Sequence, residues 1–183
     1  MLVQSKMKII LRLTLLLALF RISPAFAYAY FTEASLLASF FPGASVSAES
    51  WTVTPEQREA FKGRVGYYPP SKSYTWHVAR VGSEVTGYAL VDEQLGQHEP
   101  ITFGVALRPD ATIERIEVMV YREAYGDGVR AEGFREQFVG LDFLNPMRPG
   151  KEIRIVSGAT ISTRALSTGA RRASALLATW LGG

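Results

Sequence analysis

Small and hydroxyl-bearing residues gather at residues 155–163, where the sequence IVSGATIST precedes the last long helical pattern of the chain. The hydroxyls come from Ser157, Thr160, Ser162 and Thr163, and the small residues between them are Gly158 and Ala159. A helix that begins here would present unpaired backbone N–H groups and the positive end of its dipole, which favour an anion such as phosphate. The alternative is structural: Ser157 caps the helix, and Thr160 and Ser162 fill its first turn.

Several other chemistries are excluded by the residue types. The chain has no Cys, which excludes a disulfide protein, a thiolate metal site, a lipoprotein and a c-type haem carrier. The two histidines, His77 and His98, lie in different segments and do not have the spacing of a zinc site. Ser157 lacks the Gly-x-Ser-x-Gly elbow of a hydrolase. We therefore expect neither a metal site nor a catalytic side chain of the chain's own.

The N-terminal segment, residues 1–27, has the three parts of a secretory signal. Its basic start holds Lys6, Lys8 and Arg12, its apolar core is LTLLLALF at 13–20, and it ends in small residues at Ala25 and Ala27. A core of this length is too short for a membrane-spanning helix, which needs roughly 20 residues. We predict cleavage after Ala27 and a periplasmic or otherwise exported protein. The alternative is an uncleaved membrane anchor at residues 9–29.

The formal charge of +3 is concentrated in that segment, which holds four basic residues and no acidic one. Its removal leaves 16 basic and 17 acidic residues, so the remainder is close to neutral. Nucleic acid is therefore not an expected partner. Residues 28–183 are long enough and apolar enough for one domain with its own core.

The hydrophobic patterns of residues 28–183 predict an α+β domain, with an antiparallel sheet of about four to five strands and helices packed on it. Strands are predicted at 74–81, 84–93, 100–107 and 112–121 in meander order, with a further short strand at 151–156. Helices are predicted at 33–41, from Thr54 to about Lys62, at 131–140, and from Thr160 through Trp180. On this last helix, Arg171 and Arg172 are expected to face solvent.

The sequence SGATIST at 157–163 resembles the flavinylation motif Ser/Thr-Gly-Ala-Thr-x-Ser/Thr of the FMN-binding domain family. That family includes the flavin subunits of Rnf-type complexes and of sodium-pumping NADH:quinone oxidoreductases. Other similar segments are LLASFFPGA at 36–44, VTGYAL at 85–90, residues 98–126 and FREQFVG at 134–140. Because these segments occur in the family's order around a full motif, the resemblance covers most of residues 28–183.

The resemblance implies that Thr160 carries FMN through a phosphoester bond, which a flavin transferase forms with the FMN part of FAD. It also places Glu123 and Tyr125 beside the flavin ring, Tyr125 stacking on it and Glu123 binding polar atoms of the loop or the flavin. The alternative is that Tyr125 caps the sheet and Glu123 pairs with Arg122 or Arg130.

The implied function is that of an electron carrier between membrane or periplasmic redox partners, rather than a stand-alone enzyme. One position departs from the family: Arg154 stands where the family has Asp, six residues before the modified Thr. Flavinylation could therefore require a matched transferase, be inefficient or fail. The competing hypothesis is a flavin-free or non-covalent FMN-binding module that serves as an assembly or interaction subunit. The sequence indicates no oligomeric state.

Overall fold

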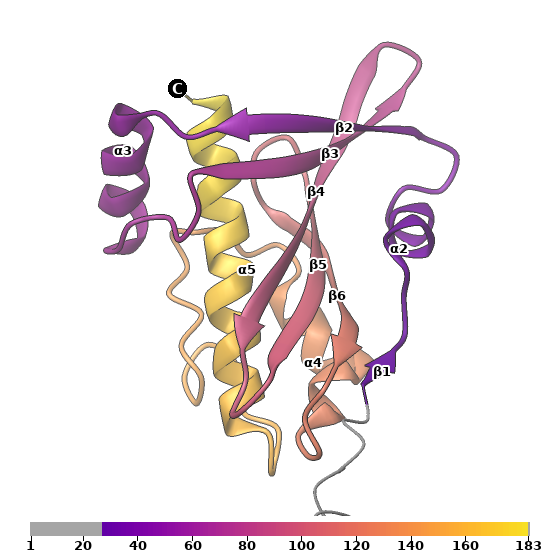
Figure 1. Cartoon of the computed structure of the whole chain (residues 1–183), viewed down its shortest axis with the longest axis vertical. Coiled ribbons are helices and arrows are strands. Elements are labelled where there is room, and N and C mark those ends of the chain that lie inside the picture. The colour runs from indigo at the N-terminus through magenta and orange to yellow at the C-terminus, as the bar shows by residue number, and fades with distance from the viewer. Residues whose placement is uncertain (1–26, 183) are drawn as a thin grey trace, which may run out of the picture.

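The structure is a computed structural model that describes residues 27–182. Apart from Ala27, the predicted signal segment lies outside the described residues. Figure 1 shows an antiparallel sheet with one long helix along one face and shorter helices around it. The predicted α+β fold is therefore confirmed.

Among the described residues the sheet has six strands, in the order β1-β6-β5-β4-β3-β2. Their bounds are β1 (Tyr28–Ala29), β2 (Ser45–Thr52), β3 (Ser73–Val81), β4 (Glu84–Leu95), β5 (Pro100–Leu107) and β6 (Ile113–Tyr121). The four predicted meander strands are β3 to β6, and every neighbouring pair is antiparallel. The predicted strand number was too low because both edge strands were missed. β1 has only two residues, and most of β2 is Ser, Ala and Glu, so neither carries a strong apolar alternation.

The helices are α2 (Glu33–Phe40), α3 (Pro55–Val65), α4 (Glu132–Arg135) and α5 (Thr160–Leu181), with 3-10 turns η1 (Asp127–Arg130) and η2 (Glu136–Phe138). Two of the helices, α2 and α3, begin where the sequence places capping residues. Thr32 and Thr54 form capping boxes at α2 and α3, and Gly66 ends α3 with a left-handed φ of 88°. Within residues 27–182, none of these helices is both long and apolar enough to cross a membrane.

The predicted strand at 151–156 is wrong. This segment forms a tight turn in which Lys151 N–H donates to Arg148 O and Gly150 N–H donates to Ile153 O, at 3.1 and 2.8 Å. Only an isolated bridge between Pro149 and Ile153 resembles strand pairing. Of the alternating apolar residues that suggested a strand, Ile153 is buried and Ile155 is exposed.

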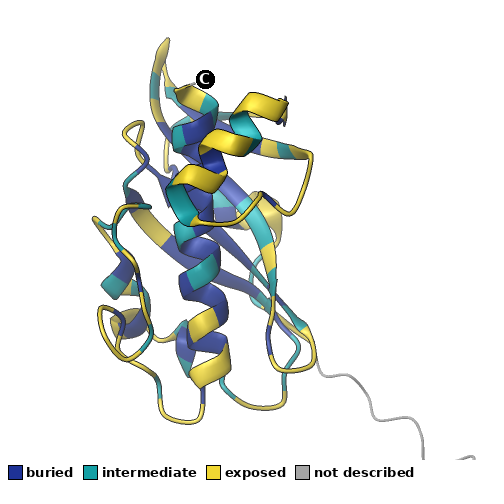
Figure 2. Ribbon diagram, turned by 90° about the vertical axis from the view of Figure 1, so that its left-hand side faces the viewer, coloured by how far each residue is buried: buried dark blue, intermediate teal, exposed yellow. Residues whose placement is uncertain are grey.

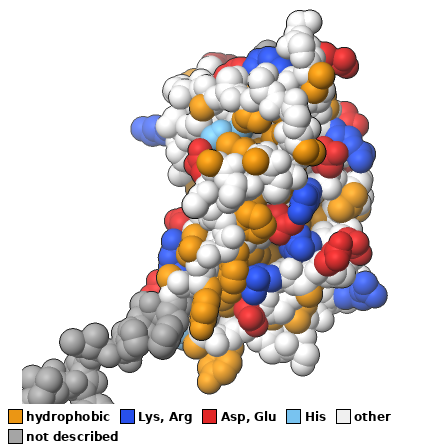
Figure 3. All heavy atoms as spheres, turned by 90° about the vertical axis from the view of Figure 1, so that its right-hand side faces the viewer, with side chains coloured by type: hydrophobic (Ala, Val, Ile, Leu, Met, Phe, Trp, Pro, Cys, Tyr) orange, Lys and Arg blue, Asp and Glu red, His pale blue; other side chains and the backbone are white. Residues whose placement is uncertain are grey.

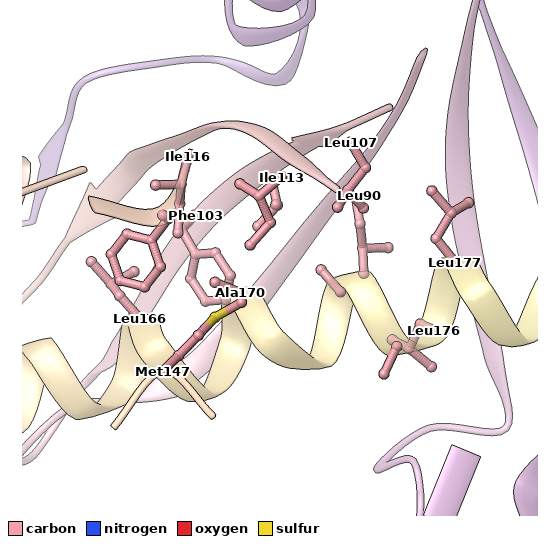
Figure 4. Close-up of a cluster of buried hydrophobic side chains, with 14 of the residues drawn as sticks. Leu90, Phe103, Leu107, Ile113, Ile116, Met147, Leu166, Ala170, Leu176 and Leu177 are labelled. Carbon is pink, nitrogen blue, oxygen red and sulfur yellow. The ribbon is translucent and has the colours of Figure 1, made fainter. Parts of the chain in front are cut away.

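The main core lies between α5 and the inner face of the sheet (Figure 4). Figure 2 shows that the middle turns of α5 are almost wholly buried. At Gly169 the helix packs closely on β5, because a Cβ at this position would lie 2.2 Å from Phe103 Cζ. Glycine there lets the Phe103 ring contact the helix backbone. The packing fixes the height of α5 on the sheet and so the position of its first residue, Thr160.

The opposite face of the sheet carries a smaller apolar cluster under α2, centred on Leu36, Phe40 and Met119. On this side, Figure 3 shows hydrophobic side chains in a band along the face. The cluster leaves the end of the sheet near β1 less covered, since Tyr28 is 58% exposed.

The expectation that Arg171 and Arg172 of α5 both face solvent is wrong for Arg172. Its guanidinium is buried and contacts Asp92 Oδ2 of β4 at 2.7 Å, while it also donates to Gln94 Oε1 and Glu93 O. Arg171 is half-buried and donates to Phe143 O at 3.0 Å. The sequence shows two adjacent arginines but cannot show that a carboxylate eighty residues earlier lies under one of them.

Candidate functional site

The start of α5, the turn between β4 and β5, and the loop that follows β6 lie together at the lower end of the molecule in Figure 1. The hydroxyl-rich segment forms the turn before α5: Ala159 N–H donates to Val156 O at 2.9 Å, and Thr163 N–H donates to Ala159 O at 2.8 Å. Gly158 has a left-handed φ of +73°, with open space where a Cβ would be. A larger residue at 158 would therefore strain the backbone, and its side chain would occupy this open space.

Among the described residues, no side chain caps the start of α5. The N-cap position is Ala159, and Ser157 is exposed, so the alternative in which Ser157 caps the helix is wrong. The first N–H groups of a 22-residue helix therefore point outward without a side-chain acceptor. An uncapped helix start of this length is suited to hold one oxyanion group.

Thr160 is exposed at the edge of a hollow of about 230 Å³. The residues that line the hollow are Gln97, Glu123, Tyr125, Gly158, Ala159, Thr160, Ile161 and Ser162. Six of the eight predicted site residues are thus brought together, although Glu123 and Tyr125 are more than thirty residues from the motif. Ser157 lies beside the hollow in sequence without lining it, and Thr163 is fully buried behind it. Gln97 and Ile161 were not among the predicted site residues. Ile161 is the variable position of the motif at 157–163, and Gln97 lies just before the similar segment at 98–126.

Ser162 is buried and binds the Tyr121 hydroxyl at 2.9 Å between oxygens. The same Tyr121 hydroxyl donates to the backbone oxygen of Tyr125 at 2.5 Å, so Tyr121 joins the first turn of α5 to the loop after β6. Gly126 makes this approach possible, because a Cβ there would lie 2.7 Å from the Tyr121 hydroxyl. Burial raises the pKa of Tyr121, which keeps it protonated as the donor. Ser162 therefore positions the loop in addition to lining the hollow.

Glu123 fastens the same loop to the turn between β4 and β5. Its Oε1 accepts from His98 N–H at 2.6 Å and from Glu99 N–H at 3.1 Å. The alternative pairing with Arg122 or Arg130 is wrong, since Arg122 contacts Glu93 and Arg130 lies over the Tyr30 ring. Burial raises the pKa of Glu123, but the backbone N–H donors of His98 and Glu99 outweigh it and hold the pKa below its ordinary value of 4.5.

Tyr125 does not cap the sheet. Its side chain is 86% exposed, and only its backbone oxygen takes part in the contact with Tyr121. An exposed tyrosine at the edge of the Thr160 hollow is free to stack on a planar ligand.

Replacing Glu123 by Gln is expected to lower the free energy of unfolding at neutral pH, because a neutral amide accepts the two backbone N–H donors less strongly. A carboxylate whose folded pKa is lowered stabilises the fold above its unfolded pKa, and this contribution is lost as the pH falls through the folded value. In urea unfolding, the free energy of unfolding of the variant should thus be lower than that of the wild type at about pH 7, and the two values should agree at about pH 3. The exposed Glu84→Gln serves as control. A difference that persists in acid would contradict this role of the carboxylate.

Comparison with known proteins shows that part of the chain is similar to a protein family. Residues 96–175 match the family model described as FMN-binding domain. One subunit of the proton-translocating ferredoxin:NAD(+) oxidoreductase complex of Clostridium ljungdahlii is 28% identical over 115 residues, which are 59% of this chain and 62% of that relative. The crystal structure of Shewanella oneidensis NqrC is similar with a TM-score of 0.47 and 15% identity, covering 76% of this chain and 79% of that chain. The matched range includes Glu123, Tyr125 and Thr160, and the resemblance inferred from the sequence is confirmed.

Proposed function

Since this chain belongs, through residues 96–175, to the FMN-binding domain family, we propose that it is an exported electron carrier with FMN joined to Thr160 by a phosphoester bond. The observation that carries the proposal is the exposed Thr160 at the uncapped start of α5, beside a hollow. A hydroxyl buried among packed side chains could not be reached by a transferase or hold a three-ring chromophore.

The residues at this end of the molecule fit the phosphate of FMN. Backbone N–H groups at the start of α5 would donate to the phosphate oxygens, and Gly158 leaves the approach open. The phosphodiester keeps one negative charge, for which contact with the dipole of α5 contributes about 0.3–1 kcal/mol at an exposed site. The flavin, when bound, supplies the redox chemistry by accepting and releasing electrons. The chain holds the group, fixes the loop beside it through Tyr121 and Glu123, and presents it to partners.

Attachment requires a flavin transferase with FAD as the donor. The Thr160 oxygen forms a bond to the phosphorus of the FMN part, the bond from that phosphorus to AMP breaks, and AMP leaves while the hydroxyl loses its proton. A covalent bond suits an exported carrier, because a reversibly bound cofactor is lost when its free concentration falls below the dissociation constant.

Arg154, in place of the family's Asp, bears on attachment rather than on the hollow. Its side chain is exposed, and its backbone N–H and Nε both donate to Gln137 Oε1, at 2.8 and 3.3 Å. Arg154 thus faces outward from the turn before α5, where a transferase would approach. We propose that the chain needs a transferase adapted to a positive charge at this place.

The test of the proposed function is coexpression of the chain with a flavin transferase. The peptide that contains Thr160 is expected to gain the mass of FMN minus water, and yellow fluorescence should stay with the denatured protein band. The proposed partners are a membrane or periplasmic electron donor and acceptor. Absence of both signals with every transferase tried, in a folded protein, would favour the flavin-free or non-covalent module instead.

Export is proposed from residues 1–27, and the fold is compatible with cleavage after Ala27. Removal of that segment would leave Tyr28, the first residue of β1, as the new N-terminus, so that no strand is shortened. N-terminal sequencing of the protein from an exporting host is expected to give Tyr28, Ala29 and Tyr30. Recovery of the uncut chain in the membrane fraction would instead indicate the anchor at 9–29.

A further inference from the structure

A second and larger hollow adjoins the hollow beside Thr160. It has a volume of about 470 Å³ and is lined by Tyr28, Tyr30, Tyr121, Glu123, Ala124, Asp127 and Arg130. Glu123 lines both hollows, so the two are neighbours at this side chain. Pockets for small ligands and cofactors usually have volumes of about 300–1,000 Å³. The volume of the second hollow lies in this range, whereas the 230 Å³ of the hollow beside Thr160 lies below it. The hollow beside Thr160 is therefore smaller than a usual cofactor pocket, and the second hollow supplies further space next to it.

One wall of the second hollow is aromatic. Tyr28 lies in β1 and Tyr30 directly follows it, and their rings are nearly parallel, at 11°, with centroids 6.3 Å apart. The Arg130 guanidinium lies 3.3 Å from the centroid of the Tyr30 ring. This cation–π contact holds the Tyr30 ring in place. Tyr28 is 58% exposed and so has ring surface left to contact a ligand. A wall of this kind is suited to a flat aromatic group.

The pairing of β1 with β6 sets this wall beside the attachment point. Tyr28 lies opposite Tyr121 in the register, and Tyr30 N–H donates to Met119 O at 2.8 Å. The buried Tyr121 lines the second hollow, and its hydroxyl binds Ser162 in the first turn of α5. One residue thus connects the aromatic wall to the turn that carries Thr160.

We propose that the wall formed by Tyr28 and Tyr30 holds the three-ring part of the FMN whose phosphate is joined to Thr160, an inference that rests on the proposed function. β1 lies outside the family-matched residues 96–175, so this wall is supplied by the segment that precedes the matched domain. The wall shields one side of the ring from water and restricts its motion. Tyr125, at the edge of the smaller hollow, is the competing stacking residue.

The experiment compares flavinylated variants of the full chain after coexpression with a transferase. Tyr28→Leu with Tyr30→Leu keeps apolar bulk but removes both rings, and Tyr28→Leu alone changes only the more exposed of the two. Tyr68→Ala is the matched control, because Tyr68 is an exposed tyrosine just after α3 that lines neither hollow. The readouts are the FMN mass on the Thr160 peptide, flavin fluorescence yield and fluorescence anisotropy.

The expected result is an unchanged FMN mass with a several-fold rise in flavin fluorescence and a fall in anisotropy for the double variant, and a smaller change for Tyr28→Leu. The reason is that a tyrosine in contact with an excited flavin quenches it by electron transfer. Full FMN mass with unchanged fluorescence and anisotropy would overturn the inference alone, as would a response confined to Tyr125→Ala. A wild-type protein that gains no FMN mass would overturn the proposed function, and this inference with it.

Discussion

Thr160→Ala is expected to abolish covalent FMN completely, because no neighbouring hydroxyl can replace the Thr160 oxygen. Ser162 is buried and bound to Tyr121, and Thr163 is fully buried on the side of α5 away from solvent. Ser157 is exposed but lies in the turn before α5, outside the hollow that Thr160 borders. The loss of label should therefore be all or none rather than partial, as judged by the mass of the 155–163 peptide and by fluorescence of the denatured band.

Two variants act as controls for this result. Thr160→Ser keeps a hydroxyl at the same place and should retain attachment, whereas Ser157→Ala removes an exposed hydroxyl that caps no helix and should leave the label unchanged. The Tm values of the three proteins should agree closely, because the Thr160 and Ser157 side chains are both exposed. A label that persists in Thr160→Ala would falsify the assignment of the acceptor.

The predictions from sequence succeeded where a local signal was sufficient. Thr32 and Thr54 are followed three residues later by side chains that complete capping boxes, and both helices start there. The alternation of apolar residues in β3 to β6 was sufficient to predict these four strands, because one face of each strand is buried under α5. The turn at Gly158 was also recognised from its residues alone, since hydroxyls and glycine before an apolar helix are a local pattern.

The predictions failed where tertiary packing decides the role of a residue. Nothing near Tyr121 in the sequence shows that its hydroxyl will join Ser162 to the backbone of Tyr125. The two-residue β1 is held by pairing with β6, and a strand of that length has no periodicity to detect. Glu123 was placed near the flavin by resemblance, but its contact with the backbone of His98 depends on two loops meeting in space.

Asp92→Ala is expected to produce the largest loss of stability, because it leaves the Arg172 guanidinium buried without its counter-charge. The Arg172 side chain is 7% exposed and contacts Asp92 at 2.7 Å, and its remaining partners, Gln94 and the backbone of Glu93, are neutral. Removing one member of a buried ion pair costs about 3–5 kcal/mol. For a domain of this size that corresponds to a fall in Tm of roughly 6–20 °C.

A double variant separates the buried charge from the loss of packing. Arg172→Met with Asp92→Leu replaces the pair by apolar side chains, and its Tm should lie near that of the wild type, because apolar replacement of a buried pair is often neutral. The exposed pair of Arg148 and Glu152 gives the control, and Glu152→Gln should change the Tm little. An unchanged Tm in Asp92→Ala would contradict this account of how α5 is held to β4. Attachment of FMN should survive in the double variant, because Thr160 lies about 18 Å from Arg172 along the helix and depends on Gly169 and Tyr121 for its position.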